Sequence, residues 1–315
     1  MAESVADVPL VICLFGPTAA GKTAVAIDLL DELPCDIVSV DSMMVYRGMD
    51  IGTAKPDAAA LARAPHRLVD IREPWESYSA GEFCSDVAVA LTDIAAAGQI
   101  PLLTGGTMMY FNALQKGLAK LPVADEHLRA QINARAAEHG WPFLHLELQQ
   151  LDPAAAARIK PMDAQRIQRA LEVIIISGQP LSYLQQATQP AVQARYLNIG
   201  LMPPDRALLH QRIKQRFTAM LHTGFVAEVE GLLALPAMSA SVPAMRAVGY
   251  RQIAGYLTGE CSLDQAVEDA VVATRRLAKR QMTWMRSMPD VHVVDSDATD
   301  CSLQVRAVLR SLLTL

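Results

Sequence analysis

The chain has 315 residues, of which 51% are hydrophobic and 19% are charged, so a well-filled core is expected and global disorder is excluded. The length fits one large α/β domain or a domain with a sizeable insertion. The acidic N-terminus argues against a signal peptide, and the lack of an apolar run of about 18 residues argues against a membrane helix. The five cysteines are scattered and form no C-x-x-C pattern, which favours a reducing cytoplasm over a zinc site or disulfide framework.

The first recognisable element is a phosphate-binding loop. A short apolar run at residues 9–15 reads as a buried strand, and it leads into Gly16-Pro17-Thr18-Ala19-Ala20-Gly21-Lys22-Thr23, which fits G-x-x-x-x-G-K-[ST]. A helical pattern follows at 24–30. This order points backbone N–H groups, a helix N-terminus and the Lys22 ammonium at one small volume. The sequence therefore predicts a phosphate or diphosphate site, in which the Thr23 hydroxyl can ligate Mg²⁺.

Further strand–helix units follow up to about residue 120. We expect strands at 35–42 and 65–70, a helix at 80–97, and a strand at 100–104 closed by Gly105-Gly106-Thr107. Strands that alternate with helices predict a parallel sheet with functional loops at the carboxyl ends of its strands. The phosphate loop, Asp41 and Thr107 each follow such a strand, so we expect them to meet in one crevice.

The pattern changes between residues 124 and 194, where helices are predicted at 125–139, 142–151 and 163–177. Strand character returns at 195–201, a long helix follows at 205–221, and a short apolar run at 291–294 precedes a terminal helix. The simplest fold class is α/β, with a parallel-sheet core of the P-loop NTPase type. Residues 1–123 and 195–315 would form this catalytic core, and residues 124–194 a helical insertion domain.

Positive charge is concentrated in three segments, although the net charge of the chain is −5. Residues 274–286 carry five cations and no acid. The second segment contains Arg158, Lys160, Arg166 and Arg169, and the third contains Arg206, Arg212, Lys214 and Arg216. One such cluster is usually a solvated face. Three in a net-acidic chain favour a polyanionic partner.

The acidic residues depart from the usual NTPase pattern, in which an apolar strand ends in a carboxylate that helps to hold Mg²⁺. Here the strand at 100–104 ends in threonine, and the available acid is Asp41 on another strand. Asp41 can be a turn residue or helix N-cap, hold a metal indirectly, or act as a base. The departure favours a loop that holds diphosphate as a leaving group over one that cleaves a nucleotide.

Several strings together resemble the bacterial tRNA dimethylallyltransferases. The phosphate loop alone is not specific, but Gly48-Met49-Asp50-Ile51-Gly52-Thr53-Ala54-Lys55-Pro56 is. Further strings extend the match to nearly the whole chain. They are Asp41-Ser42, Val45-Tyr46-Arg47, Pro65-His66-Arg67-Leu68, Gly105-Gly106-Thr107, residues 165–173 and 246–251, and the segment around 279–284. The resemblance implies an NTPase-like α/β core with a helical insertion. The zinc finger of the eukaryotic relatives has no counterpart among the scattered cysteines.

The resemblance also implies a reaction. A dimethylallyl group would pass from dimethylallyl diphosphate to N6 of adenosine 37 in the anticodon loop of tRNAs that read codons starting with U. Residues 16–23 with Arg216 would hold diphosphate, Thr23 would place Mg²⁺, and Asp41 would be the general base. Thr107 would hydrogen-bond near the amine or the bridging oxygen. The partners implied are the tRNA anticodon stem-loop and dimethylallyl diphosphate, with no membrane and no obligate protein partner, so that a monomer is expected.

By the same resemblance, the target base is flipped into the crevice while basic segments hold the loop. Met43 can line the base pocket or simply pack, and Trp284 and Met285 can be core residues instead of stacking platforms. The residues assigned to tRNA are Asp41, Ser42, Met43, Met44, Thr107, Arg129, Gln165, Arg166, Ile167, Gln168, Arg169, Arg246, Ala247, Val248, Gly249, Tyr250, Arg251, Lys279, Arg280, Gln281, Met282, Thr283, Trp284, Met285 and Arg286.

Two other classes of function compete with this interpretation. A small-molecule or nucleoside kinase would release phosphate from ATP without RNA, but it leaves the basic segments and the missing strand-end acid unexplained. A non-catalytic RNA-binding protein would bind without turnover, and the intact Gly21-Lys22-Thr23 argues against a degenerate loop.

Overall fold

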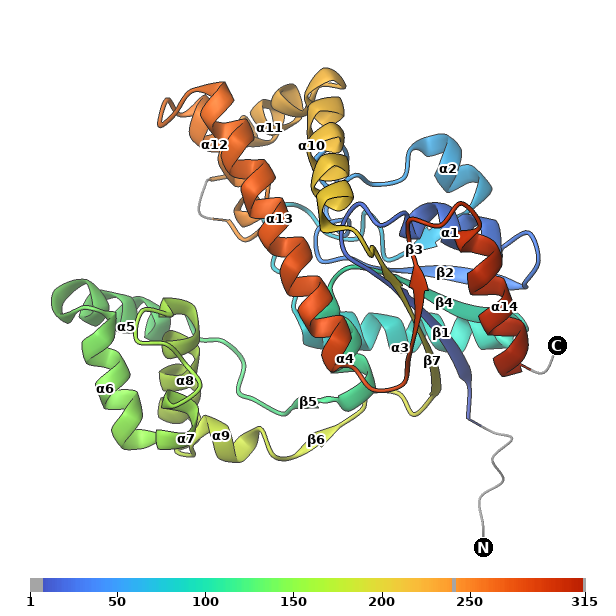
Figure 1. Cartoon of the computed structure of the whole chain (residues 1–315). Coiled ribbons are helices and arrows are strands. Elements are labelled where there is room, and N and C mark those ends of the chain that lie inside the picture. Colours follow the sequence, from blue (N-terminus) through green and yellow to red (C-terminus); the bar gives the residue numbers. More distant parts are fainter. Residues whose placement is uncertain (1–7, 240–241, 314–315) are drawn as a thin grey trace, which may run out of the picture. The chain divides into compact units, whose positions relative to one another are not determined.

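The computed structural model describes residues 8–239 and 242–313, and the chain forms two compact units (Figure 1). The core unit combines Met1–Gln115 with Val192–Leu315, and the insertion unit is Lys116–Ala191. The sequence placed the insertion at 124–194. It begins earlier because β5 (Leu118–Ala119) pairs antiparallel with β6 (Thr188–Gln189), which joins the two ends of the insertion.

A six-stranded sheet forms the centre of the core unit, and all its neighbouring strands run parallel. The predicted α/β class is thereby confirmed. The third strand is shorter than the predicted 65–70, because Leu68 and Asp70 have φ angles of 62° and 55° and turn the chain. In spatial order the strands are β3 (His66–Arg67), β2 (Cys35–Val40), β4 (Ile100–Gly105), β1 (Leu10–Phe15), β7 (Arg195–Met202) and β8 (Val291–Asp295).

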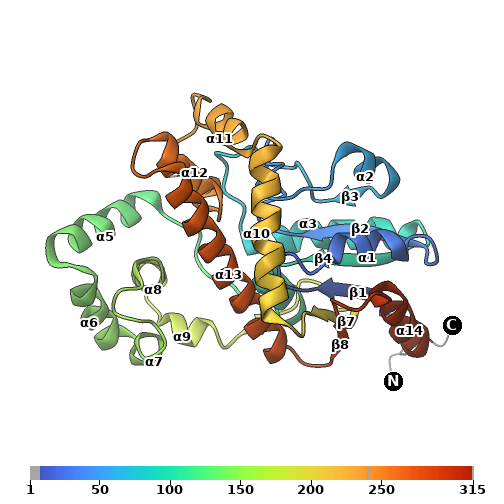
Figure 2. The ribbon, with the colours of Figure 1, turned by 45° about the horizontal axis from the view of Figure 1, so that its top comes forward.

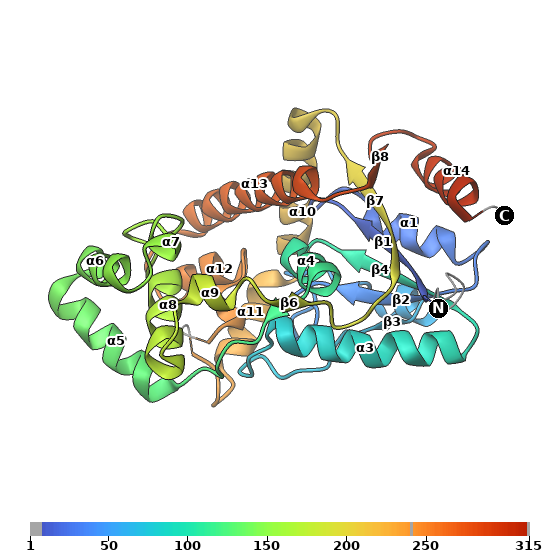
Figure 3. The same ribbon diagram turned by 90° about the horizontal axis from the view of Figure 1, so that it is seen from below.

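Helices cover both faces of this sheet, as the apolar strands require. Alternate residues of β1 divide between the faces: Ile12 and Leu14 pack with α1 (Lys22–Leu29) and α14 (Cys301–Leu313). Their neighbours Val11 and Cys13 face α3 (Ala80–Ala96) and α4 (Met108–Lys116) on the other side. Figure 3 shows α3 and α14 on opposite sides of the strands. One more short helix, α2 (Ala58–Arg63), precedes β3.

A second group of helices packs against the segment that follows β2 (Figure 2). Val45, Tyr46 and Met49 from this segment share a core with Phe225 and Tyr250. The sequence predicted one helix of the group, at 205–221, identified 274–286 as a basic segment, and missed the rest. Its members are α10 (Arg206–His222), α11 (Phe225–Leu233), the 3₁₀ turn η2 (Ala244–Arg246), α12 (Tyr250–Leu257) and α13 (Leu263–Ser287).

The insertion unit is helical and has its own core, built around Ile132, Leu148, Ile167 and Leu171. Aspartates at 125, 152 and 163 cap the first turns of its helices with their side chains. Its helices are α5 (Glu126–His139), α6 (Trp141–Leu151), α7 (Pro153–Ala156), α8 (Ala164–Ser177) and α9 (Leu181–Leu184). Across residues 8–239 and 242–313, no helix is both long and apolar enough to span a bilayer.

Candidate functional site

The core unit contains a cavity of about 600 Å³ at the carboxyl ends of β1, β2 and β4, with α10 and α13 among its walls. The crevice expected from the strand ends is therefore present. The sequence-predicted residues that line it are Thr18, Ala19, Gly21, Lys22, Thr23, Asp41, Ser42, Met43, Met44, Thr107, Arg216, Ala247, Val248, Tyr250, Arg280, Gln281 and Trp284.

The phosphate loop has the backbone conformation that anion binding requires. Gly21 caps α1 with φ 81°, and Ala19 adopts the same left-handed region at φ 65°. The amides at the start of α1, which have no partner within the helix, are therefore available to an anion in the cavity that the loop lines. The Lys22 ammonium folds back over the loop and donates to the carbonyl of Pro17 at 2.9 Å.

Two cations and one carboxylate surround this loop. Burial first, and then the nearby Arg216 guanidinium, lower the pKa of Lys22 to about 8, and Asp41 opposes both effects. Burial also lowers the pKa of Arg216, which Asp41 partly offsets. Arg216 comes from α10, so the structure brings together groups that lie almost 200 residues apart in sequence. Such a site favours an anion that can supply the missing negative charge.

Asp41 directly follows β2 and uses its two carboxylate oxygens differently. Its Oδ1 accepts hydrogen bonds from the amides of Met43 at 2.8 Å and Met44 at 3.4 Å, which fixes the turn after the strand. Among the described residues Oδ2 has no hydrogen-bond partner. The turn-residue reading of Asp41 is thus correct for one oxygen, and the other oxygen is left for a ligand.

Thr107 lies beside Asp41 because β2 and β4 are neighbours. Its Oγ1 accepts a hydrogen bond from the Ser42 amide at 3.0 Å, and its own amide donates to the Val40 carbonyl at 3.2 Å. Strands β2 and β4 approach so closely here that a Cβ at Gly105 would lie 2.0 Å from the Val40 carbonyl oxygen. Only glycine fits at this position, and it permits the turn that carries Thr107.

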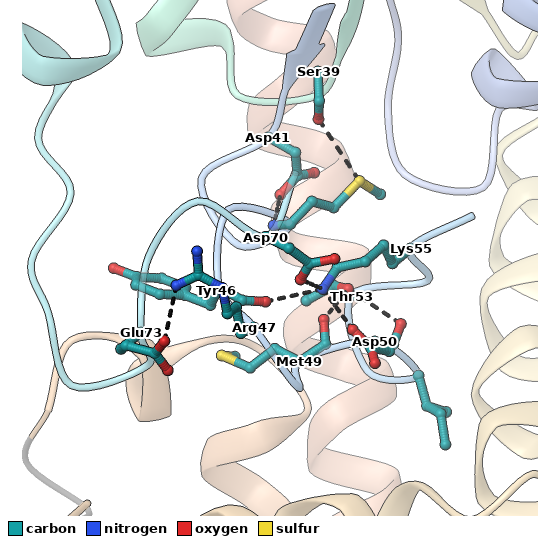
Figure 4. Close-up of polar contacts among 12 residues, drawn as sticks. Ser39, Asp41, Tyr46, Arg47, Met49, Asp50, Thr53, Lys55, Asp70 and Glu73 are labelled. Carbon is teal, nitrogen blue, oxygen red and sulfur yellow. Dashed lines mark hydrogen bonds and ion pairs between the residues drawn. The ribbon is translucent and has the colours of Figure 1, made fainter. Parts of the chain in front are cut away.

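Lys55 anchors the segment from 41 to 56 that follows Asp41 (Figure 4). Its ammonium donates to the carbonyl of Tyr46 at 2.9 Å and to Oδ1 of Asp50 at 2.5 Å and of Asp70 at 2.6 Å. The Lys55 side chain is only 3% exposed, so both carboxylates compensate a buried charge. The distinctive string of the sequence therefore has a structural basis: Lys55 holds it in place, and its residues Gly52, Thr53, Ala54 and Pro56 line the same cavity as Asp41.

Glu228 on α11 holds the same segment from the other side. Its carboxylate accepts hydrogen bonds from the amides of Asp50, Ile51 and Gly52 at 3.1, 2.7 and 3.1 Å, and from the Tyr250 hydroxyl at 2.5 Å. Burial first, and then Glu228 itself, raise the pKa of Tyr250, so that its hydroxyl remains a donor. We call this arrangement the Glu228 clasp. Nothing in the sequence pattern singled out Glu228.

Helix α13 divides the predicted tRNA-binding segment between two faces. Gln281, Met282 and Met285 are buried, and of these three only Gln281 lines the cavity. Gln281 accepts from the Thr18 amide and donates to the Gly106 carbonyl, both at 2.9 Å, which braces the phosphate loop. Trp284 is 41% exposed and lines the cavity, so it is available for stacking. Lys279, Arg280, Thr283 and Arg286 are exposed as well.

The insertion unit uses two predicted tRNA-binding arginines to compensate a buried acid. Glu172 is fully buried, and it accepts from Arg129 at 2.8 Å and from Arg169 at 2.5 Å. Burial would raise the pKa of Glu172, but these hydrogen bonds and that of the Asp125 amide hold it below its usual range.

The rest of the predicted helix segment 165–169 divides between surface and core. Ile167 is fully buried in the insertion core and has no surface for RNA. Gln168 donates to Asn133 at 2.7 Å. Gln165 and Arg166 are exposed, as are Arg246 and Arg251 in the core unit, whereas Gly249 is buried.

Sequence reasoning missed several residues that line the cavity. Ser39 and Thr104 lie at strand ends, and the position of Thr104, where NTPases place an acid, was the available signal. The apolar part of the lining includes Met108, Met109, Ile213, Phe217, Met220 and Leu277. Ile213, Phe217 and Met220 share a helical face with Arg216, a spacing that could have indicated them.

The oxygen donors of the cavity suit Mg²⁺. They are the Thr23 hydroxyl, the free oxygen of Asp41, and the buried Thr104 Oγ1, which has no hydrogen-bond partner in the described part of the chain. Mg²⁺ prefers such hard oxygen ligands and usually keeps several waters beside one or two protein groups and substrate phosphates. No group of three or more His, Cys, Asp or Glu residues forms an all-protein metal cage within 8–239 and 242–313.

Comparison with known families places this geometry in context. A family model described as IPP transferase matches residues 44–288, which is most of the chain. The chain belongs to the IPP transferase family. This assignment confirms the resemblance found in the sequence.

Relatives of known name and structure match this IPP transferase over nearly its whole length. The tRNA dimethylallyltransferase of Thiobacillus denitrificans is 52% identical over 306 residues, covering 97% of this chain and 98% of the relative. The tRNA isopentenylpyrophosphate transferase of Bacillus halodurans has a TM-score of 0.70 at 34% identity, with 96% of each chain covered. That of Staphylococcus epidermidis has a TM-score of 0.69 at 30% identity, covering 98% of this chain and all of the relative.

Proposed function

We propose that the chain transfers a dimethylallyl group from dimethylallyl diphosphate to N6 of adenosine 37 in the anticodon loop of tRNAs that read codons starting with U. Membership of the family makes it a tRNA dimethylallyltransferase. The observation that carries the detailed proposal is the shared cavity, which brings the phosphate loop, Arg216, Thr107 and the free oxygen of Asp41 together.

The diphosphate end of the donor fits the phosphate loop. The free amides at the start of α1, the Lys22 ammonium and the Arg216 guanidinium can all contact the anion. As the bond between the allylic carbon and the bridging oxygen breaks, negative charge accumulates on the leaving diphosphate, and these groups stabilise it. Mg²⁺, held by Thr23, would supply further neutralisation of that charge.

The acceptor end fits Asp41 and Thr107. N6 of adenine forms the new bond to the allylic carbon and must lose a proton, and Asp41 Oδ2 is the carboxylate oxygen left to take it. Thr107, held next to Asp41 by Ser42, is placed to hydrogen-bond the amine or the bridging oxygen. Apolar residues such as Phe217 and Met108 surround the same volume and suit a five-carbon tail.

Binding of tRNA is proposed to use the exposed face of α13. Arg280 and Trp284 lie at the cavity, where an arginine can contact backbone phosphate and an indole can stack on an unpaired base. Two exposed arginines, Arg246 at the end of η2 and Arg251 in the first turn of α12, extend this basic surface. We propose that the enzyme works as a monomer, and that it acts in the cytoplasm, where its tRNA substrate is.

The proposal is tested by incubating the protein with labelled dimethylallyl diphosphate and unmodified tRNA that contains A36-A37-A38. The expected result is label on N6 of adenosine 37 with release of diphosphate, and no label when A37 is replaced by guanosine. Transfer of phosphate from ATP, or ATP hydrolysis stimulated by RNA, would return the chain to the kinase and NTPase classes. Binding of tRNA without any transfer would make it a non-catalytic RNA-binding protein.

A further inference from the structure

Two buried hydroxyl groups lie at the floor of the cavity, and neither the proposed reaction nor the family assignment gives them a task. Ser39 is 3% and Thr104 is 7% exposed, and both line the cavity. Among the described residues, Thr104 Oγ1 has no hydrogen-bond partner. Ser39 Oγ donates only to the thioether of Met44 at 3.8 Å, which is a weak acceptor (Figure 4).

The sheet places these two hydroxyls side by side. Ser39 and Thr104 are direct partners in the parallel pairing of β2 with β4, and Thr104 also pairs with Leu14 of β1. Neighbouring strands are about 4.8 Å apart, so two side chains on the same face at this register are within reach of one small molecule such as water.

Both side chains face the helix that starts with Lys22 and Thr23. Ile37 on β2 and Leu102 on β4 pack in the core cluster that includes Val25 and Ala26 of α1. Because side chains alternate along a strand, Ser39 and Thr104 lie on this same face, one step nearer the carboxyl end. The phosphate loop joins the end of β1 to the start of α1, so the hydroxyl pair lies on the side of the sheet where Thr23 begins its helix.

A buried hydroxyl without a partner costs folding free energy. Valine would fill the position of Thr104 with the same shape and no such cost, and it favours strands. The strand end is also where NTPases carry the acid that contacts Mg²⁺. Retention of a neutral hydroxyl at this position therefore points to a ligand that fills its hydrogen bonds.

We propose that Ser39 and Thr104 bind a water molecule of the Mg²⁺ ion that Thr23 ligates, and so form the outer shell of the metal–diphosphate subsite. The inference rests on the diphosphate and Mg²⁺ roles of the proposed function. Mg²⁺ keeps several of its waters when it binds to proteins and phosphates, and outer-shell partners orient such ligands. Two neutral hydroxyls do this without adding a negative charge next to the diphosphate, which a strand-end carboxylate would do.

The test is calorimetric titration of the full-length protein with inorganic pyrophosphate, in EDTA and over a series of Mg²⁺ concentrations. The variants are Thr104→Val and Ser39→Ala, with Thr104→Ser as the conservative variant that keeps a hydroxyl. Thr92→Val is the matched control, because Thr92 is exposed on the outer side of α3 and bonds only within its own helix.

In the unaltered protein, Mg²⁺ should tighten pyrophosphate binding. In Thr104→Val, the Mg²⁺ concentration needed for this effect should rise by about 10-fold to 100-fold, as for other outer-shell changes, while the affinity in EDTA stays the same. Ser39→Ala should show the same loss, and Thr104→Ser and Thr92→Val should behave as the parent. Thermal unfolding without ligand should occur at the same or a higher temperature in Thr104→Val, because an unpartnered buried hydroxyl has been removed.

Three results would overturn the inference. Unchanged Mg²⁺ dependence in both variants would show that the hydroxyls bind no metal-held water. An equal loss of affinity in EDTA would show that they contact phosphate directly or support the fold. An unaltered protein that transfers the prenyl group, but whose pyrophosphate binding ignores Mg²⁺, would overturn the inference and leave the transfer reaction standing; a lack of transfer would instead overturn the proposed function.

Discussion

Asp41 shows how one carboxylate can serve both structure and chemistry. Oδ1 holds the turn through the amides of Met43 and Met44, and Oδ2 is free for a proton. A substitution that keeps the first role and removes the second can therefore separate them. Asparagine has this property, since its carbonyl oxygen accepts hydrogen bonds and its amide cannot accept a proton from N6.

We predict that Asp41→Asn binds tRNA and pyrophosphate with near-parent affinity but transfers the prenyl group about 10²-fold to 10⁴-fold more slowly, the usual loss for a general base. Single-turnover transfer and separate binding titrations measure the two quantities. Asp57→Asn is the matched control, because Asp57 caps the exposed helix α2. Transfer by Asp41→Asn at close to the parent rate would show that Asp41 is not the base.

The lowered pKa of Lys22 predicts a pH dependence of anion binding. Burial and Arg216 bring this pKa to about 8, so below pH 8 the free protein already carries the ammonium, and above it the neutral amine must take up a proton when pyrophosphate binds. Affinity should therefore fall as the pH rises through 8, and uptake of up to about one proton should appear at pH 9.

Calorimetry in two buffers of different ionisation enthalpy measures this uptake, and Lys22→Arg, which stays charged at pH 9, provides the comparison. The difference between the two proteins isolates the lysine from the ionisation of pyrophosphate itself. Equal proton uptake by both would mean that Lys22 keeps its proton throughout this pH range.

At the scale of elements, α13 joins two tasks on opposite faces of one helix. Its exposed face carries Arg280 and Trp284 at the cavity, and its buried face carries Gln281, which bridges the phosphate loop and the turn after β4. The neighbouring residues 280 and 281 therefore serve as controls for each other.

We predict that Arg280→Ala weakens tRNA binding and flattens the slope of log K against log salt by about 0.7–0.9, as expected for one lost phosphate contact. Gln281→Leu should leave that slope unchanged and weaken pyrophosphate binding by about tenfold, because the Thr18 amide and the Gly106 carbonyl lose their partner. Filter binding over a salt series and pyrophosphate calorimetry test the pair. A weaker tRNA affinity for Gln281→Leu, with pyrophosphate binding intact, would restore the direct tRNA contact predicted from sequence.

The sequence predicted best those elements whose signals are local. The strand, phosphate loop and helix at 10–29 follow from an apolar run, a glycine pattern and a helical period. The other strands of the sheet, apart from the two-residue β3, have comparable apolar runs. The direction in which Gln281 points could not be predicted, since it depends on the packing of α13 against the loop. The ion pairs of Arg129 and Arg169 could not be predicted for the same reason: their partner Glu172 is buried by tertiary contacts that no local pattern shows.

At the scale of the molecule, the two units have separate cores, and the ends of the insertion lie next to each other. Leu118 and Gln189 are partners in the β5–β6 pair, and all residues that line the cavity belong to the core unit. The diphosphate site should therefore not depend on the insertion for its folding.

We predict that replacing residues 118–189 by a short Gly/Ser linker leaves a folded core unit that binds pyrophosphate within about threefold of the parent, because a flexible linker readily spans such adjacent ends. Circular dichroism and calorimetry test this outcome, and the same protein carrying Lys22→Ala provides the negative control for binding. Loss of pyrophosphate binding, with the fold intact, would mean that the insertion completes the diphosphate site.

The Glu228 clasp sets which substitutions its segment can tolerate. It recognises three successive backbone amides, so the side chains at 50 and 51 are irrelevant to it, and relatives can vary there as far as Lys55 and the core permit. Proline at 50, 51 or 52 would remove one of the amide donors that the Glu228 carboxylate binds. Position 52 accepts glycine alone, because any Cβ would lie 2.2 Å from the Phe225 ring. This part of the cavity lining therefore depends on two residues about 175 positions apart in the chain: the Glu228 carboxylate, and Gly52, which has no side chain.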